Sequence, residues 1–304
     1  MSCQIGSSYK VQAGDTLFDI AEQQLGSGER WKEIMKPNGT PFSEEEAEDL
    51  QTGQEICLPT GETQIDQSTT QAIPGVEFFP PGTLNQLNTL TGLDAQQITN
   101  ILGMINGPEQ SNSKWWQTAD NKIIYGYAED IDDGRGVTIG IYGATTGKNY
   151  NDADIIWENY GQDYSNLPTD EIIEKVNEIA NDPKWWKAQW DAYISTYWQP
   201  TLKLLKSKNY SKALTIGVLI DTAMNAGMED DNSKHWGVNH LFEEASSDTN
   251  DEQDFLNKFI DLRLQYPTKN SGDMKERIGA WQNLLRDNQW DLRVDLNKYV
   301  YIPE

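Results

Sequence analysis

Apolar and polar residues are patterned over the first 60 positions in a way that predicts a small module of two strands and two helices. The apolar stripe of the first helix consists of Leu17, Ile20, Ala21 and Leu25. Asp15 or Thr16 is expected to cap this helix, because either side chain can accept a backbone hydrogen bond at its start. Ser43 and Glu46 have the spacing of a capping box. The expected order is strand, helix, helix and strand, over residues 9–14, 15–26, 30–35 and 54–59.

The rest of the chain has mostly helical periodicity. Residues 61–83 lack periodicity and are rich in Thr, Gln, Gly and Pro, which is typical of a linker. Two apolar runs, residues 122–130 and 137–143, flank a turn and predict a β-hairpin. Helices are expected over residues 93–105, 165–180, 183–205, 210–227, 251–267 and 273–290. The predicted fold class is therefore α+β, a mainly helical domain with a small sheet that follows a βααβ module, and the Trp-rich helix is expected to supply core residues.

The charge of the chain limits its partners. Its 304 residues include 48 acidic and 24 basic ones, for a formal net charge of −24. This excess of acids disfavours binding to the phosphate backbone of nucleic acids and favours a cationic partner. A surface that only keeps the protein soluble is the alternative. No apolar run reaches the roughly 18 residues of a membrane span, so we expect no membrane partner.

Other residue types exclude further kinds of site. The two histidines, His235 and His240, and the spacing of the cysteines do not form a zinc motif, so we expect no metal and no cofactor. Cys3 and Cys57 can form one bridge but no disulfide framework. Residues 1–10 contain neither the basic nor the apolar segment of a signal peptide. Either the protein stays inside the cell, or a signal was removed or lies outside this sequence.

Two carboxylates have the arrangement that hydrolysis of a glycosidic bond requires. The apolar face of residues 93–105 reaches Glu109 when it is extended by one turn, which predicts a carboxyl where the core meets a cleft. There it would keep the proton that a general acid needs, whereas an exposed Glu beyond the helix end is the alternative. Asp133 lies in an Asp-Gly-Arg-Gly turn in which Arg135 can hold its carboxylate, although such turns are also common in ordinary hairpins. A Glu that closes a helix and an Asp on the next hairpin are a pair suited to glycoside hydrolysis.

The stretches "YKVQAGDTLFDIA" and "LQTGQEICLP" in the first 60 residues resemble a LysM domain, a module that binds chains containing N-acetylglucosamine (GlcNAc). The resemblance implies a sugar groove between the loop after the first strand and the loop before the last one. The implied sugar-binding residues are Gly14, Asp15, Thr16 and Leu17 on one side and Gln51, Thr52 and Gly53 on the other. The implied partners are chitin or the GlcNAc chains of peptidoglycan. A structural module with an inactive groove is the alternative.

A second resemblance covers most of residues 95–295. "PEQSN" followed by "YAEDIDDGRGVTIGIYG" is similar to the active-site region of the glycoside hydrolase family 46 chitosanases. That family has a Glu before Asn-Ser-Ser, and then Tyr-Ile-Glu-Asp-Ile-x-Asp-Gly-Arg-Gly-x-Thr-x-Gly. The resemblance implies that Glu109 is the general acid, that Asp133 is the general base, and that Thr138 helps to place the attacking water. The implied supporting residues are Glu129 and Arg135.

The chain departs from this family pattern in two places near Glu109. Gln110 stands where Asn is usual. The segment between Glu109 and the hairpin is longer and adds "KWWQTADNK", residues 114–122. The wall of the cleft beside Glu109 is therefore the part that the resemblance constrains least.

Five charged residues later in the chain match further positions of the same family. "NDADIIWENY" resembles a segment whose first Asp binds a glucosamine amine, which points to Asp152, although this residue could also cap a helix. Asp221 and Arg263 lie on apolar helix faces, and we expect them to pair because buried charges are costly when unpaired. By the resemblance, Arg277 joins them behind the catalytic base and Asp273 binds substrate. The alternative is that all of these are exposed helix charges.

These observations together predict a LysM module over residues 1–60, a linker over 61–83 and a chitosanase-like domain with a lysozyme-like fold over 84–304. The resemblance implies endo-hydrolysis of β-1,4 glucosamine linkages in chitosan with inversion, and the acidic charge fits this cationic polymer. A peptidoglycan muramidase on the same fold and a non-catalytic cell-wall-binding protein are the alternatives. This activity favours a secreted or cell-wall-associated protein, but no signal peptide is visible, so the location stays open.

Overall fold

The structure, a computed structural model, divides into two compact units that are described separately. Unit 1 comprises Met1–Ala72 and Pro81–Leu87, and unit 2 comprises Ile73–Pro80 and Asn88–Glu304. The described residues are 7–12, 14–25, 28–43, 46–47, 49–58, 73–147, 152–230, 236–265 and 271–303. Within these ranges, no helix is long and apolar enough to cross a membrane.

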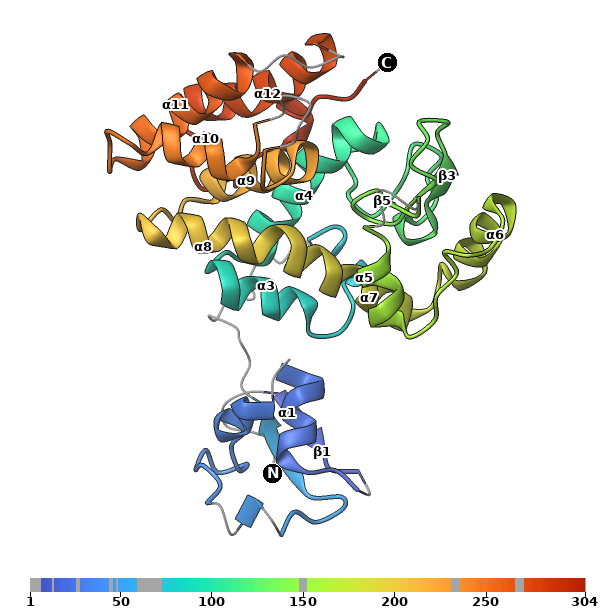
Figure 1. Cartoon of the computed structure of the whole chain (residues 1–304). Helices are drawn as coiled ribbons and strands as arrows, with labels where there is room; N and C mark the ends of the chain where they lie inside the picture. Colours follow the sequence, from blue (N-terminus) through green and yellow to red (C-terminus); the bar gives the residue numbers. More distant parts are fainter. Residues whose placement is uncertain are drawn as a thin grey trace. The chain divides into compact units, whose positions relative to one another are not determined.

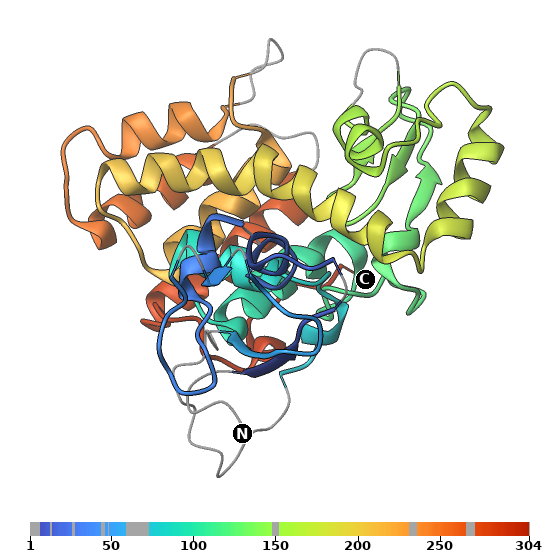
Figure 2. The ribbon, with the colours of Figure 1, turned by 90° about the horizontal axis from the view of Figure 1, so that it is seen from below.

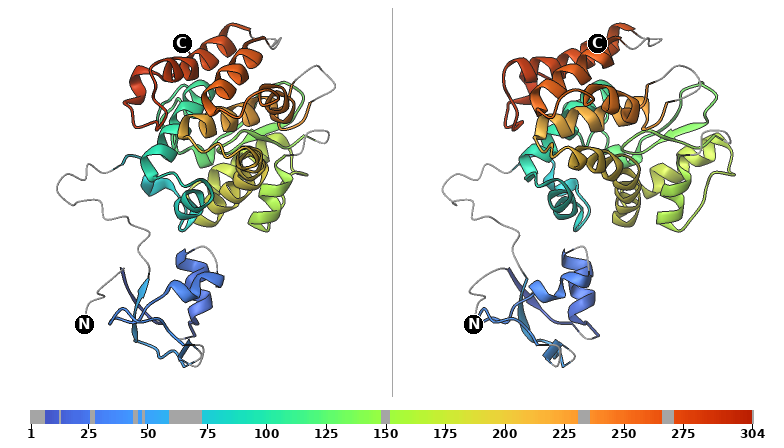
Figure 3. Two further views of the ribbon diagram at one scale, coloured as in Figure 1. Left: turned by 90° about the vertical axis from the view of Figure 1, so that its left-hand side faces the viewer. Right: turned by 60° about the vertical axis from the view of Figure 1, so that its left-hand side comes forward.

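Unit 1 has the strand, helix, helix, strand order that the sequence predicts, and Figure 3 shows its helices beside the two strands. Its elements are β1 (Ser7–Lys10), α1 (Leu17–Leu25), the 3-10 helix η1 (Gly28–Glu33) and β2 (Glu55–Leu58). The two strands pair antiparallel. Cys57 in β2 is disulfide-bonded, and Cys3 lies outside the described residues.

Side-chain hydrogen bonds fix the starts of the helical turns in unit 1. Asp19 N donates to Thr16 Oγ1 at 3.0 Å, so Thr16 rather than Asp15 caps α1. Ser43 N donates to Glu46 Oε2 at 2.8 Å, and Glu46 N donates to Ser43 Oγ at 3.2 Å, which confirms the capping box. The core of this unit consists of Val11, Leu17, Ile20, Ala21, Ile34, Phe42, Ile56 and Leu58.

The remainder of the chain is mainly helical, as the sequence predicts (Figure 1). The α-helices are α3 (Thr83–Thr91), α4 (Ala95–Gln110), α5 (Asp154–Tyr160), α6 (Thr169–Ile179), α7 (Pro183–Tyr193), α8 (Gln199–Ser207), α9 (Ala213–Ala226), α10 (Val238–Ala245), α11 (Glu252–Gln265) and α12 (Ser271–Arg286). Short 3-10 helices occur at η2 (Val76–Phe78), η3 (Ile124–Gly126) and η5 (Leu296–Lys298). Residues 97–107 of α4 and 213–223 of α9 are all buried, so these two helices form the centre of unit 2. α9 contacts α4, α8, α10 and α12.

A three-stranded antiparallel sheet lies with α5 and α6 on one side of unit 2 (Figure 2). Its strands are β3 (Ala128–Asp130), β4 (Val137–Ile139) and β5 (Ala144–Thr145), in that order. The expected hairpin is therefore present, with shorter strands than the apolar runs indicated. Glu129 lies opposite Thr138, and Thr138 lies opposite Thr145.

One long helical segment connects this sheet region with the larger helical part (Figure 2). α7 continues through a π-helical segment, η4 (Ile194–Trp198), into α8. Trp185, Trp190 and Trp198 of this segment are completely buried, as expected for core residues. Phe79 packs on the same core, with its ring centroid 5.1 Å from that of Trp190. Phe79 thereby anchors residues 73–80, which precede α3, in the core of unit 2.

Candidate active site

Asp133 lies in the exposed turn between β3 and β4, where Arg135 holds its carboxylate. Arg135 N donates to Asp133 Oδ1 at 2.9 Å, and Arg135 Nε donates to Asp133 Oδ2 at 2.6 Å. These hydrogen bonds lower the pKa of Asp133, and the backbone bond from Arg135 contributes most. The turn requires glycine at Gly136, whose φ is 78°, because a Cβ there would lie 2.9 Å from Thr146 Oγ1. The turn thus holds an ionised carboxylate in a defined position.

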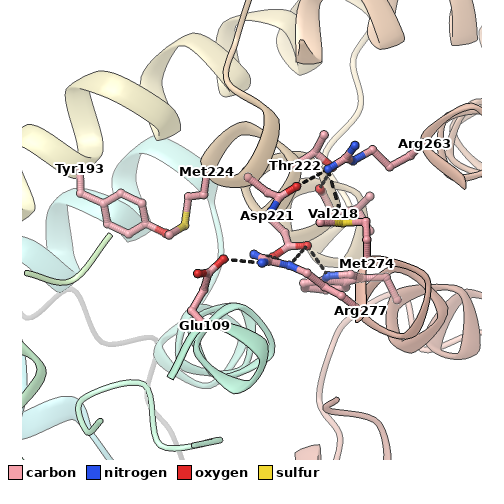
Figure 4. Close-up of polar contacts among 11 residues, drawn as sticks. Glu109, Tyr193, Val218, Asp221, Thr222, Met224, Arg263, Met274 and Arg277 are labelled. Carbon is pink, nitrogen blue, oxygen red and sulfur yellow. Dashed lines mark hydrogen bonds and ion pairs between the residues drawn. The ribbon is translucent and has the colours of Figure 1, made fainter. Parts of the chain in front are cut away.

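Glu109 lies in the last turn of α4, with 41% of its side chain exposed. The helix includes Pro108 and runs to Gln110, and Ser111 ends it in the left-handed conformation with φ 49°. α4 therefore extends beyond its buried stretch, and this extension carries Glu109 out of the core. The carboxylate forms an ion pair with Arg277 of α12, whose Nη1 donates to Glu109 Oε1 (Figure 4).

Arg277 also binds Asp221 of the central helix α9, and Figure 4 shows the guanidinium between Asp221 and Glu109. Arg277 Nη2 donates to Asp221 Oδ1 at 2.6 Å, and Arg277 Nε lies 3.0 and 3.1 Å from Oδ1 and Oδ2. Trp281 Nε1 donates to Asp221 Oδ2 at 3.0 Å. Only 6% of the Arg277 and Asp221 side chains is exposed. Burial alone would lower the pKa of Arg277, but the carboxylates of Asp221 and Glu109 outweigh it and raise that pKa.

We expected Asp221 to pair with Arg263, but in the structure Asp221 pairs with Arg277. The carboxylate of Asp221 is bound by Arg277 and Trp281, whereas Arg263 Nη2 donates to Asn225 Oδ1 and lies 3.5 Å from Met274 Sδ. Arg263 is buried, and this burial lowers its pKa to about 10, although the charge of Asp221 opposes the shift. The network also reaches Glu109, the candidate acid, rather than the candidate base that the resemblance suggested.

Glu129 of β3 and Thr138 of β4 lie opposite each other on neighbouring strands of the sheet. Thr138 is 8% exposed, and its Oγ1 has no hydrogen-bond partner among the described residues. Glu129 is exposed and accepts a 3.3 Å hydrogen bond from Tyr127 OH. The pKa of Tyr127 is raised to about 12, first by burial, then by Glu129 and finally by the charge of Glu109. Tyr127 therefore lies near the carboxylates of Glu129 and Glu109. No sequence signal singled it out, although it begins the quoted hairpin motif.

A pocket of about 470 Å³ brings some of these residues together beside the end of α4. Glu109 and Glu129 both line it, and its other walls come from residues 118–122 and from α6. Among the described residues, Asp133 and Thr138 are outside this lining, on the turn and strand next to it. A larger hollow of about 770 Å³ lies between α8 and α10 and contains none of the predicted site residues. Residue chemistry therefore favours the smaller pocket as part of the active site.

Tyr197, in the π-helical segment η4, lies near both Asp152 and Glu109. Its pKa is raised to about 12, first by burial and then by the charges of Asp152 and Glu109. Asp152 is exposed and accepts a hydrogen bond of 3.4 Å from Thr145 Oγ1. Asp152 does not cap α5, because the N-cap position is Ala153 and no side chain bonds there. Tyr197 could not be predicted from the sequence, since a single π-helical turn inside a Trp-rich helix leaves no spacing signal.

Asp273 lies in the first turn of α12, one turn before Arg277. Its exposed carboxylate accepts a hydrogen bond of 3.0 Å from Tyr301 OH. The backbone of Tyr301 also lies against α4, because a Cβ at Gly107 would come within 2.8 Å of the Tyr301 carbonyl oxygen. The end of the chain thus runs between the segment of α4 that carries Glu109 and the segment of α12 that carries Asp273.

In unit 1, the two loops of the predicted sugar groove are adjacent. Val11 N donates to Gln54 O at 3.0 Å, and Gly53 N donates to Val11 O at 2.8 Å. Gly14 and Gly53 adopt positive φ values of 91° and 83°, which favour glycine. The backbones of the two loops are therefore joined at the base of the predicted groove, near Thr52, which is exposed.

The side chains of this predicted groove differ in their availability. Asp15 Oδ2 accepts hydrogen bonds from Tyr9 OH at 2.9 Å and from Gln12 N at 2.8 Å, so this carboxylate stabilises the loop. Leu17 is 2% exposed and belongs to the core of unit 1. Its side chain therefore does not line a groove, contrary to the expectation. Gln51 is exposed and its N donates to Gln54 Oε1 at 3.0 Å.

Comparison with known families matches two parts of the chain. Residues 9–59 match the LysM domain, and residues 154–296 match Glycosyl hydrolase family 46. The second match begins after the hairpin, so it does not include the two candidate carboxylates. The proposed roles of Glu109 and Asp133 are therefore supported by the structure around them and by the sequence motif that resembles the family, and not by this match.

Individual relatives cover more of the chain. A chitosanase of Niallia circulans is 31% identical over 249 residues, which is 72% of this chain and 78% of that protein. A chitosanase of Bacillus subtilis (strain 168) is 27% identical over 210 residues, which is 58% of this chain and 75% of that protein. The solved native chitosanase from Bacillus subtilis MY002 aligns with a TM-score of 0.53 and 25% identity, over 66% of this chain and 93% of that one. A mutant of the same enzyme, complexed with 6 GlcN, aligns equally well.

Proposed function

The chain belongs to glycosyl hydrolase family 46, and we propose that it hydrolyses β-1,4 glucosamine linkages within chitosan. The observation that carries this proposal is the 31% identity to a chitosanase over 72% of the chain. The complex of a structurally similar chitosanase with 6 GlcN supports glucosamine oligomers as ligands. The net charge of −24 supports a cationic polymer further, because a negative surface attracts protonated amines.

In the proposed reaction, Glu109 donates a proton to the glycosidic oxygen as the bond to the anomeric carbon breaks. Asp133 accepts a proton from a water whose oxygen forms the new bond on the opposite face of the sugar, so the configuration inverts. The lowered pKa of Asp133 supports this role, because a base must be ionised. Thr138 lies on β4, the strand that follows the Asp133 turn, and is proposed to help to place this water.

The other predicted residues either position these two carboxyls or bind substrate in the proposal. Arg277 holds the Glu109 carboxyl at the end of α4, and Asp221 with Trp281 fixes the guanidinium. Asp152 and Asp273 are exposed carboxylates that can bind the ammonium groups of glucosamine units. Arg135 keeps the base in place by its two hydrogen bonds. These are positioning and binding roles, not chemical steps.

The LysM module is proposed to hold the enzyme on GlcNAc-containing chains. The match of residues 9–59 to the LysM domain supports this role. A substrate that contains both sugars, such as partly acetylated chitosan, would engage both units of one molecule. The exposed residues of the predicted groove, which can meet a sugar, are Gly14, Thr16, Gln51, Thr52 and Gly53.

The test of the proposed function compares purified protein on chitosan and on peptidoglycan by the release of reducing ends. Glu109→Gln should reduce turnover of chitosan by roughly 10²- to 10⁴-fold, which is the usual contribution of a general acid. Its melting temperature should stay nearly unchanged, because the amide oxygen can still accept the hydrogen bond from Arg277. The matched control is Glu243→Gln, an exposed position on α10 away from the site.

Each outcome of that comparison separates the alternatives. Cleavage of peptidoglycan but not chitosan would replace the proposal with a muramidase on the same fold. Cleavage of neither polymer would leave a wall-binding protein. Substantial activity in Glu109→Gln would remove Glu109 from the acid role while leaving the substrate assignment intact.

The stereochemistry of the product tests the mechanism separately. Inversion at a β-linkage gives the α-anomer first, because the water attacks from the face opposite to the leaving group. Proton NMR of the earliest products from a glucosamine hexamer should therefore detect the α-anomer before mutarotation. An initial β-anomer would overturn the assignment of Asp133 as the base that activates water.

A further inference from the structure

The segment of residues 296–302, which begins with η5, packs against the second half of α4. Gly103 and Gly107 lie one turn apart on this helix, and both contact the segment. A Cβ at Gly103 would overlap Leu296 Cδ1, and a Cβ at Gly107 would overlap Val300 Cγ2. Because neither glycine has a side chain, the segment lies directly on the backbone of the helix that carries the candidate acid.

Tyr301 of this segment contacts two helices of the candidate active site. Its carbonyl oxygen would lie 2.8 Å from a Cβ at Gly107, so its backbone lies against α4 two residues before Glu109. Its hydroxyl donates to Asp273 Oδ1 of α12 at 3.0 Å. Tyr301 is partly buried, whereas Asp273 is exposed. Tyr301 thus connects a solvent-facing carboxylate on α12 to the backbone of α4.

The place of Asp273 on α12 brings it close to the candidate acid. Asp273 and Arg277 are four residues apart, so their side chains lie on the same face of the helix, with Cβ atoms about 5–6 Å apart. Arg277 Nη1 donates to the carboxylate of Glu109. Asp273 therefore lies one helical turn from the group that holds the acid, where an exposed carboxylate can meet an ammonium group of the polymer.

The hydrogen bond from Tyr301 restricts what the Asp273 carboxylate can do. An aspartate in the first turn of a helix has several rotamers, and it can turn toward the backbone N–H groups at the helix start. Binding of an ammonium group would have to select one orientation, which costs conformational entropy and affinity. A carboxylate accepts several hydrogen bonds, so the bond from Tyr301 can fix its orientation and leave it able to bind a cation.

We infer that Tyr301 is a positioning residue for substrate binding. Its hydroxyl holds the Asp273 carboxylate in the orientation that meets an ammonium group of the polymer, and the packing of residues 296–302 on α4 sets that orientation relative to Glu109. The inference rests on the proposed function, because it concerns affinity for the same polymer. Tyr301 acts through Asp273 and takes no part in the chemical step.

Tyr299 provides the matched control within the same segment. Its hydroxyl donates to Asp287 Oδ2 at 3.2 Å, so it makes the same kind of exposed bond. Asp287 directly follows α12, about 20 Å along the helix from Asp273. Tyr299→Phe and Tyr301→Phe therefore remove equivalent bonds at opposite ends of one helix. Both variants should keep the melting temperature of the parent, because neither bond is buried.

Affinity and turnover are measured separately with a glucosamine hexamer. Calorimetry gives Kd in the Glu109→Gln background, and kinetics give KM and kcat in the active background. Tyr301→Phe should raise Kd and KM by roughly 3- to 10-fold, the cost of ordering one side chain on binding, with kcat within about twofold. Tyr299→Phe should match its parent in all three quantities.

A double-mutant cycle with Asp273→Ala tests whether Tyr301 acts through this carboxylate. Asp273→Ala should raise Kd at least as much as Tyr301→Phe, because it removes the group that binds the ammonium. In the Asp273→Ala background, Tyr301→Phe should cause no further loss of affinity, since it then has no carboxylate to position. A purely structural role of Tyr301 would instead give the same loss in both backgrounds.

The inference is overturned if Tyr301→Phe or Asp273→Ala binds the hexamer with unchanged affinity. It is also overturned if Tyr299→Phe loses as much affinity as Tyr301→Phe, or if Tyr301→Phe still weakens binding in the Asp273→Ala background. Each of these results leaves hydrolysis of chitosan by the wild-type chain in place, so it contradicts the inference alone. Failure of the wild-type chain to cleave chitosan would overturn the proposed function, and the inference with it.

Discussion

At the scale of single residues, the two candidate carboxylates differ in what surrounds them. Asp133 is held by a neighbour two positions away in the same turn, through two hydrogen bonds from Arg135. Glu109 is held by Arg277, which is 168 positions away and almost completely buried. The first arrangement fixes an ionised group in solvent, and the second connects an exposed carboxyl to the core. These surroundings fit a base and a positioned acid respectively.

The same contrast explains which residue contacts the sequence could predict. The bond between Asp133 and Arg135 is local, so the turn motif indicates it without a fold. Burial of Asp221 and Arg263 could be inferred from apolar helix faces, but the choice of partner depends on how α9 and α12 cross. That crossing brings Arg277 to Asp221 and leaves Arg263 with Asn225. The position of Tyr197 near Asp152 and Glu109 could not be predicted from the sequence for the same reason.

A prediction at this scale concerns the pH dependence of activity in Arg135→Ala. Asp133 is proposed to act ionised, so activity should fall as pH drops through its pKa. That pKa is lowered chiefly by the backbone N–H of Arg135, which alanine keeps, and next by the Arg135 side chain, which alanine removes. The pKa should therefore rise toward its ordinary value, and the acid limb of kcat should move to higher pH.

The measurement is kcat on a glucosamine hexamer across the acid range, with Arg135→Lys as the control. Lysine retains the positive charge but lacks the Nε that bonds the carboxylate. Its acid limb should lie between those of the parent and Arg135→Ala. An acid limb that stays in place in both variants would mean that another group controls it.

At the scale of elements, the long helices follow the periodicity of the sequence and the short ones do not. The expected helices over 93–105, 210–227, 251–267 and 273–290 correspond to α4, α9, α11 and α12. The helix α10 was not predicted, and α5 was considered only as a helix that Asp152 could cap, because two turns are too short to repeat an apolar spacing. The expected single helix over 183–205 is interrupted by the π-helical segment η4, which carries Tyr197. The residues of the candidate active site thus lie where a helix ends, as Glu109 does in α4, or changes its type, as at Tyr197 in η4. Apolar periodicity predicts these positions least well.

The contact between α9 and α12 gives a prediction of stability. Asp221→Ala should lower the free energy of unfolding by about 3–5 kcal/mol, because it leaves the buried charge of Arg277 with fewer partners. The loss should lie toward the lower end of this range, since Glu109 still binds Arg277. Urea denaturation followed by circular dichroism measures it, with an unchanged slope as the sign of an intact native state.

Asp191→Ala provides the matched control for that measurement. Asp191 pairs with Lys187 at 2.8 Å on α7, and both side chains are substantially exposed. Removal of such a surface pair should cost less than about 1 kcal/mol. Similar losses in the two variants would contradict the buried network around Arg277.

At the scale of the whole molecule, the two units have separate cores and separate matches to known families. Among the described residues, the core cluster of unit 1 lies between Val11 and Leu58, and the LysM match covers residues 9–59. The match to glycosyl hydrolase family 46 lies entirely in unit 2. The lack of apolar periodicity in residues 61–83 was the sequence feature that suggested a linker. A module with its own core can contribute affinity for a polymer without taking part in the chemistry.

Deletion of residues 1–60 therefore should separate binding from hydrolysis. Retention on insoluble chitin should weaken strongly, because the module that supplies the second point of attachment is gone. The kcat/KM on soluble glucosamine oligomers should stay within about twofold, since the residues of the candidate active site all belong to unit 2.

The full chain with Gln51→Ala and Thr52→Ala is the matched variant, because both residues are exposed beside the predicted groove. It should reproduce the loss on chitin if that groove binds the sugar. An equal loss of chitin binding and oligomer hydrolysis on deletion would show instead that the two units share one site.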